Sequence, residues 1–272
     1  MLDMIPAVHV DFAAEVAELH EVLRGLSEDD WGRPTLFKAW TPRDIVAHLH
    51  DSDLLARAAV LGNEAFAVAR RRMQEDVAAG AGALEQARRT AADLDSSALL
   101  TAWQRSAVEL AGLLGGLDPR QRLPWFGPDM GVSMFATARL METWAHGQAI
   151  YDMLARPRTP TARLRHVVVI GVRTYGFCFA NRRREQPGPP PHVRLEAPSG
   201  ETWTCNDPQE DERIEGSALD FCLTVTQVRH VRDTSLRVTG SAARAWMEIA
   251  QCFAGPPVDP PPPGLRLGLG SP

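Results

Sequence analysis

The spacing of apolar residues along this chain changes at a proline-rich segment, residues 187–191 (PGPPP). In the long segments before it, apolar side chains recur every three or four residues, as in helices with one buried face. After it, apolar and polar residues alternate, as in strands. The change predicts a helical domain followed by a mixed α+β domain. A length of 272 residues is sufficient for two domains that each bury a core.

The first 156 residues contain four long helical patterns: residues 11–26, 41 to about 77, 83–114 with a break near 95–96, and 133–155. The second has a clear start, because Thr41 suits an N-cap, Pro42 suits the first helical position and Asp44 completes a capping pair. Four helices of this length predict an all-α four-helix bundle over residues 1–156. We expect no strand before about residue 150.

Residues 157–258 are expected to form a smaller α+β domain. The segment 164–180 fits a helix or a buried strand, and we favour a helix. Residues 192–205 predict a hairpin that turns at 198–200, and three further elements follow: a helix over 217–228, a strand over 236–240 and a helix over 241–253. Residues 259–272 are rich in proline and glycine, so we expect a disordered tail.

The chemistry of the chain is indicated first by Glu142 and His146. Positions i and i+4 of a helix lie on one face about 6 Å apart, so this carboxylate and imidazole can bind the same divalent ion. A surface Glu–His pair would show the same spacing. The apolar neighbours Phe135 and Ala149 favour the buried alternative, in which an unpaired carboxylate would be costly.

A third ligand is predicted on the second helix. His48 shares its face with Ile45 and Leu55, so it should point into the bundle, although a lone histidine on such a face is often only a core residue. His50 points elsewhere. Together His48, Glu142 and His146 would form a His₂Glu site with at least one position open to water or substrate, which is typical of catalytic rather than structural sites.

Composition excludes several other classes of function. The formal net charge of −5 provides no basic surface for nucleic acid, and no stretch of about 18 apolar residues could span a membrane. The start of the chain does not resemble a signal peptide. The four cysteines form no C-x-x-C pattern and are expected to be reduced. We therefore expect a cytoplasmic monomer or homodimer that acts on a small molecule.

The segments WTPRDIVAHLHDSD (40–53) and ETWAHGQAIYD (142–152) resemble the DinB-like superfamily and, within it, the mycothiol-dependent maleylpyruvate isomerase family. Trp40, His48, Glu142 and His146 stand at the positions of that family's tryptophan, helix-borne histidine and Glu-x-x-x-His motif. The resemblance extends to about residue 255 and implies a four-helix metal domain with a smaller α+β domain. The most similar members belong to a metal-binding subgroup of unassigned chemistry.

The resemblance also implies a mechanism. In this family the metal, usually zinc, binds the thiol of mycothiol and lowers its pKa, and the thiolate attacks an electrophilic carbon. An arginine of the C-terminal domain contributes, and Arg229 lies nearest to that position. The sequence VTQV before Arg229 departs from the family's Gly-Arg ending of the same helix.

Further candidates follow from position alone. Asp51, three residues after His48, could accept a hydrogen bond from the His48 ring and so orient this ligand, or it could be an exposed acid. Arg139, one turn before Glu142, could clamp a substrate carboxylate or pair with an acid. His166 is a candidate catalytic residue with a structural role as its alternative. The candidates for the pocket wall are Trp125, Phe126, Trp144 and Arg173.

Three functions remain open from the sequence. The first is a mycothiol-dependent isomerase or S-transferase. The second is a thiol-independent metal-assisted hydrolase, lyase or cyclase in secondary metabolism, because the same open site can activate water. The third is a non-catalytic protein that binds a metal or a small molecule. We expect the pocket to lie between the two domains.

Overall fold

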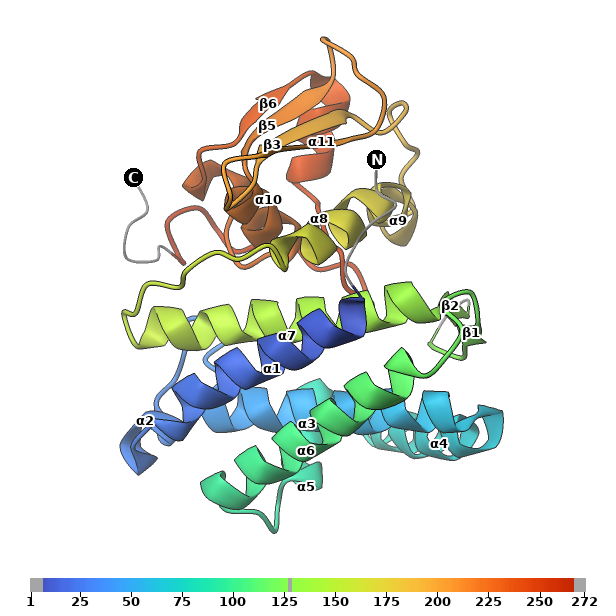
Figure 1. Cartoon of the computed structure of the whole chain (residues 1–272), viewed down its shortest axis with the longest axis vertical. Coiled ribbons are helices and arrows are strands. Elements are labelled where there is room, and N and C mark those ends of the chain that lie inside the picture. Colours follow the sequence, from blue (N-terminus) through green and yellow to red (C-terminus); the bar gives the residue numbers. More distant parts are fainter. Residues whose placement is uncertain (1–6, 127–128, 267–272) are drawn as a thin grey trace. The chain divides into compact units, whose positions relative to one another are not determined.

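The computed structural model describes residues 7–126 and 129–266, and the chain divides into two compact units, Met1–Ile150 and Tyr151–Pro272. In unit 1 the four long helices α1 (Val8–Arg24), α3 (Pro42–Leu61), α6 (Ser96–Gly115) and α7 (Val132–Met153) run side by side (Figure 1). The four-helix bundle predicted from the sequence is confirmed. Shorter helices flank it: α2 (Glu28–Gly32), α4 (Asn63–Ala78) and α5 (Ala83–Thr90).

The bundle core is formed by the apolar faces of these helices. Its largest fully buried side chains include Phe12, Leu19, Leu49, Trp103 and Phe135. The start of α3 follows the prediction, because Thr41 accepts a hydrogen bond from Asp44 N while the Asp44 carboxylate accepts one from Thr41 N. This capping box fixes where the helix that carries His48 begins.

Two details of unit 1 correct the sequence analysis. The second helical pattern is broken at Gly62, whose φ of 120° lies outside the range of a helix, so that α3 and α4 are separate. The connection to α7 contains a two-residue ladder, β1 (Arg122–Leu123) with β2 (Met130–Gly131). A strand was not expected there, because such short segments leave no periodic pattern in the sequence.

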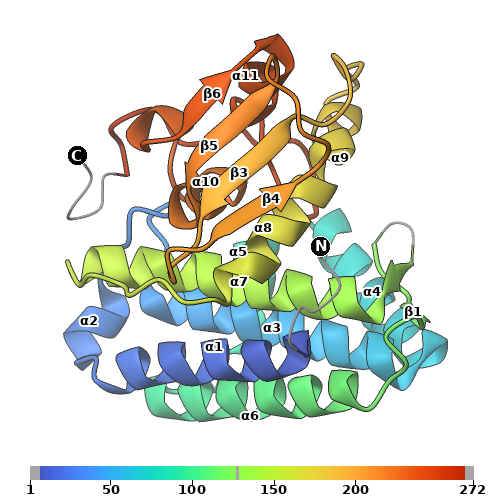
Figure 2. The same cartoon turned by 45° about the horizontal axis from the view of Figure 1, so that its top comes forward.

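Unit 2 is the predicted α+β domain. It begins within the last turn of α7 and continues with α8 (Leu164–Arg173) and α9 (Tyr175–Asn181), so the helix favoured for 164–180 is confirmed with an interruption at Thr174. The four-stranded mixed sheet of the described residues has the order β4-β3-β5-β6 (Figure 2). It comprises β3 (His192–Glu196), β4 (Thr202–Cys205), β5 (Arg213–Ser217) and β6 (Arg237–Thr239).

The predicted hairpin is present, and its register places Leu195 opposite Trp203 and Val193 opposite Cys205. The parallel neighbour β5 was not predicted. The helices α10 (Ala218–Val225) and α11 (Ser241–Met247) complete the unit, together with the short 3₁₀ helix η1 (Val231–Asp233). The predicted helix over 241–253 is therefore shorter than expected. In the core, Trp246 of α11 packs edge-on against Tyr175 and Phe221.

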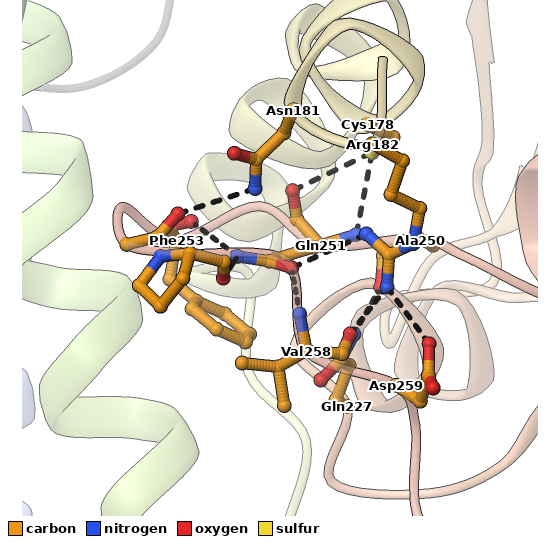
Figure 3. Close-up of polar contacts among 11 residues, drawn as sticks. Cys178, Asn181, Arg182, Gln227, Ala250, Gln251, Phe253, Val258 and Asp259 are labelled. Atoms are coloured by element: carbon orange, nitrogen blue, oxygen red, sulfur yellow. Dashed lines mark hydrogen bonds and ion pairs between the residues drawn. The ribbon is translucent and has the colours of Figure 1, made fainter. Parts of the chain in front are cut away.

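The segment after α11 is held by buried polar side chains (Figure 3). Gln251 is fully buried; its Oε1 accepts a hydrogen bond from Val258 N (3.0 Å) and its Nε2 donates to Pro256 O (3.1 Å). Gln227 Nε2 donates to Ala250 O and Val258 O, while Arg182 donates to Val258 O and pairs with Asp259. These contacts give a segment without regular structure a fixed path.

Residues 259–266 belong to the tail that we expected to be disordered. In the structure Gly264 N donates to the Asp233 carboxylate (2.9 Å), and Arg266 Nη1 donates to Gln227 O (3.0 Å). Residues 267–272 lie outside the described part of the chain.

Candidate metal centre

The three predicted ligands meet inside unit 1. His48 comes from α3, whereas Glu142 and His146 are one turn apart on α7. Glu142 Oε2 lies 3.3 Å from His146 Nε2 and 3.7 Å from His48 Nε2. One ligand atom from each residue can be chosen so that all lie within 4.8 Å of one another, so the triad can bind a metal ion.

The donor set fits a divalent ion. At the usual metal–ligand lengths, two ligand atoms of a tetrahedral zinc site are about 3.3 Å apart, close to the observed separations from Glu142. The side chains of His48, Glu142 and His146 are 19%, 22% and 10% exposed. The site is thus largely buried, and the triad provides three of the four positions of a tetrahedral site.

The electrostatics of the triad favour the protonation states that a metal requires. Burial alone would raise the pKa of Glu142, but the neighbouring His146 and His48 imidazoles hold this pKa well below its usual value. Burial lowers the pKa of His146 despite the nearby Glu142 carboxylate. Near neutral pH, Glu142 is therefore a carboxylate and His146 a neutral imidazole.

Two aromatic side chains from the segment before α3 pack against the histidines. The Trp40 ring stacks on His146 at 5.9 Å and 3°, and it meets His48 edge-on at 5.4 Å. Phe37 meets His146 edge-on at 4.9 Å. In the sequence, Trp40 is marked only by the family resemblance, and Phe37 carries no periodic or motif signal that would predict this contact.

The two nominated arginines are both engaged in ion pairs. Arg139 Nε donates to Asp53 Oδ1 of α3 at 2.9 Å, and both side chains are buried. In unit 2, Arg229 forms two contacts of 2.7 Å with the Asp152 carboxylate. The alternative that Arg139 pairs with an acid is therefore observed.

Of the other nominated residues, Asp51 lies in unit 1, and His166 and Arg173 lie in unit 2. Asp51 accepts a hydrogen bond from Thr90 Oγ1 of α5 (2.7 Å), whereas His48 contacts Glu142, Trp40 and His146. Among the described contacts, no hydrogen bond joins the His48 ring to Asp51. In unit 2, His166 is buried on α8 and Arg173 is exposed at the end of that helix.

The aromatic candidates form a separate cluster. Trp125 contacts Phe135 at 5.0 Å and Phe66 at 5.9 Å, and Phe126 contacts both Trp125 and Phe66. Phe135 is seven residues before Glu142, about 10 Å along α7 on a similar face, so the cluster packs α4 against α7 two turns from the triad. Trp144 follows Glu142 by two residues and leaves α7 on a different side.

The fold and the triad define a DinB-like protein with a candidate His₂Glu metal site. Residues 12–151 match the family described as mycothiol maleylpyruvate isomerase N-terminal domain, and the chain belongs to that family. Among curated proteins, it is 37% identical over 257 residues to the uncharacterized proteins MT0041 and Rv0036c of two Mycobacterium tuberculosis strains, with 94% of this chain and 98% of each relative covered.

Solved structures show the same fold at low sequence identity. The mycothiol-dependent maleylpyruvate isomerase matches with a TM-score of 0.53 and 13% identity, covering 82% of this chain and 90% of that enzyme. A histidine-to-alanine mutant of the isomerase matches with a TM-score of 0.50 and 14% identity, covering 81% and 88%. None of the described helices is both long and apolar enough to cross a membrane.

Proposed function

We propose that this chain is a metal-dependent enzyme that uses a low-molecular-weight thiol, with zinc as the metal and mycothiol as the thiol. The observation that carries the proposal is the nearly buried His48–Glu142–His146 triad, which provides three ligands and leaves a position open. When bound, a divalent ion in such a site supplies Lewis acidity, which lowers the pKa of a thiol or water at the open position. Isomerisation or S-transfer to an electrophilic carbon is the proposed reaction.

The residues of the chain contribute placement and shielding. Glu142 and His146 are held in their ligating protonation states, as their pKa shifts indicate. Trp40 and Phe37 cover the His146 ring and keep bulk water from that side. No arginine is assigned to the substrate, since Arg139 and Arg229 already hold carboxylates.

The metal is tested first. Elemental analysis of the purified wild-type protein should give about one divalent ion per chain, and His48→Ala and His146→Ala should each reduce this nearly to zero. His50→Gln is the matched control, because His50 also lies on α3 but bonds to Ser106 instead (2.9 Å). Full occupancy in both triad variants would reject the site.

The thiol is tested next. Mycothiol added to the cobalt-loaded protein should produce a sulfur-to-cobalt charge-transfer band, whereas S-methylated mycothiol should not. Turnover of maleylpyruvate-like electrophiles should then require both metal and thiol. Turnover that requires the metal but ignores the thiol would favour the hydrolase, lyase or cyclase alternative. A cobalt spectrum that responds to no thiol, electrophile or substrate analogue, together with absent turnover, would favour a non-catalytic binding protein.

A further inference from the structure

A buried ion pair joins the two helices that carry the metal ligands. Asp53 on α3 is fully buried, and Arg139 on α7 is 5% exposed. Their Oδ1 and Nε atoms are 2.9 Å apart. Asp53 follows His48 by five residues, and Arg139 precedes Glu142 by three, so the pair and the triad connect the same two helices within about two turns.

Burying this ion pair has a large cost in free energy, so it is an inefficient means of stabilising a helical bundle. Removing two charges from water is strongly unfavourable, and apolar side chains of similar volume often stabilise a protein as well or better. The pair is also incompletely satisfied, because Arg139 Nη2 is buried and has no hydrogen-bond partner among the described residues, whereas the Asp53 carboxylate also interacts with the Trp103 indole. Stability alone therefore does not account for a charged pair at this position.

A second ion pair of α3 provides a contrast. Asp44 pairs with Arg88 of α5 at 2.7 Å, but the Arg88 side chain is 56% exposed and remains hydrated. Asp44 also belongs to the capping box of α3. This pair has an ordinary structural role and connects α3 to a helix without metal ligands.

The geometry of the triad depends on how α3 is placed against α7. Glu142 and His146 are kept together by the i,i+4 spacing of α7 itself. His48 is brought to them by tertiary packing, and it lies 3.7 Å from Glu142 and 4.8 Å, between ring centroids, from His146. A shift of α3 by one residue would move His48 by 1.5 Å and rotate it by 100°, whereas metal–ligand distances tolerate deviations of about 0.2 Å.

We propose that Asp53 and Arg139 are positioning residues that fix the register of α3 against α7 and thereby hold His48 at ligating distance from Glu142 and His146. A charged hydrogen bond is directional, unlike apolar contacts, which permit helices to slide and repack. The inference rests on the proposed metal centre. It assigns to Arg139 a role in the metal site that requires no contact with substrate.

The test replaces the pair with apolar residues of similar size, Asp53→Leu/Arg139→Met, and measures metal affinity by competition with a chromophoric chelator. The variant should keep its helical circular dichroism and its melting temperature. Its metal affinity should fall about 10- to 100-fold, as for other residues that orient ligands, and the visible spectrum of its cobalt form should change. Arg88→Gln is the matched control: it should lower the melting temperature but leave metal affinity unchanged.

A folded double variant with wild-type affinity and an unchanged cobalt spectrum would overturn the inference. If the double variant does not fold, Arg139→Lys decides, because it keeps a cation opposite Asp53 but loses the planar donor geometry. A weakened affinity in Arg139→Lys with an unchanged melting temperature supports positioning, and an unchanged affinity contradicts it. Failure of the wild-type protein to bind metal is a distinct result, which would reject the metal centre and this inference with it.

Discussion

At the scale of single residues, the turn before α3 shows how the site is framed. Lys38 and Ala39 have φ values of 52° and 57°, in the left-handed region that costs a non-glycine residue about 1 kcal/mol or more. Trp40 N donates to Phe37 O at 2.9 Å, which closes the turn. The turn brings the Phe37 and Trp40 rings to 5.1 Å of each other, and both rings contact His146. Backbone strain is thus located directly beside a candidate metal ligand.

Glycine in this turn should stabilise the protein. We expect Ala39→Gly to raise the free energy of unfolding by about 0.5–1 kcal/mol, because relief of the left-handed strain exceeds the entropy that glycine gains in the unfolded chain. The matched control is Ala102→Gly within α6, which should lower the free energy of unfolding by about 1 kcal/mol. Urea denaturation of both variants measures the difference. A destabilised Ala39→Gly variant would show that the turn is not strained.

The sequence predicted the site where helix geometry alone determines proximity. Glu142 and His146 follow from the i,i+4 rule, and His48 from its inward face. Asp53 was missed although it lies among buried positions of α3, four residues after Leu49 and three before Ala56. An acid at such a position requires a buried partner, and Arg139 was the available cation. Phe37 could not be predicted, because its contact with His146 depends on the conformation of an irregular turn.

At the scale of elements, the long amphipathic segments were predictable and the short ones were not. The five-residue helix α2 buries only Trp31, and β5 buries only Ile214 in the sequence RIEGS. Neither leaves a period that could be recognised. The strand β5 is defined by tertiary pairing, since it lies between β3 in parallel and β6 in antiparallel orientation. Elements of this kind are stabilised by their neighbours rather than by local preference.

The helix α11 depends on one carboxylate from another element. Glu212, just before β5, accepts hydrogen bonds from the backbone N–H groups of Ser241, Ala242 and Ala243 at 2.8, 3.1 and 2.8 Å. Burial alone would raise the pKa of Glu212, but these bonds hold it below its usual value. We expect Glu212→Gln to destabilise the protein by about 1 kcal/mol at pH 7, as for the loss of a helix cap.

The pH dependence of this effect has a definite sign. A carboxyl group with a lowered pKa in the folded state contributes its stability above its unfolded pKa of about 4.3 and loses it as pH falls through the folded pKa. The difference in free energy of unfolding between wild type and Glu212→Gln should therefore shrink below about pH 4.3. A constant difference from pH 7 to pH 3 would contradict the role of the charged form.

At the scale of the whole molecule, the candidate metal centre belongs entirely to unit 1. Its three ligands, the Phe37–Trp40 turn and the Asp53–Arg139 pair all lie before residue 151. Unit 2 has its own core around Trp246 and its own polar network around Gln251. Binding of an ion to the folded triad should therefore stabilise unit 1, because the unfolded chain does not assemble the three ligands.

The metal should accordingly raise the thermal stability of the protein in proportion to its affinity. At a free metal concentration of 100 times the dissociation constant, one site that exists only in the folded state adds about 2.7 kcal/mol. Calorimetry of wild type with zinc or with a chelator should show this shift, and His146→Ala should abolish it. In Glu212→Gln, whose defect lies in unit 2, the metal-dependent shift should persist on a less stable background. Equal stabilisation of His146→Ala and wild type would mean that the ion binds elsewhere. Protons compete for the same ligands, so the shift should also diminish as pH falls through the lowered pKa of His146 in the folded protein.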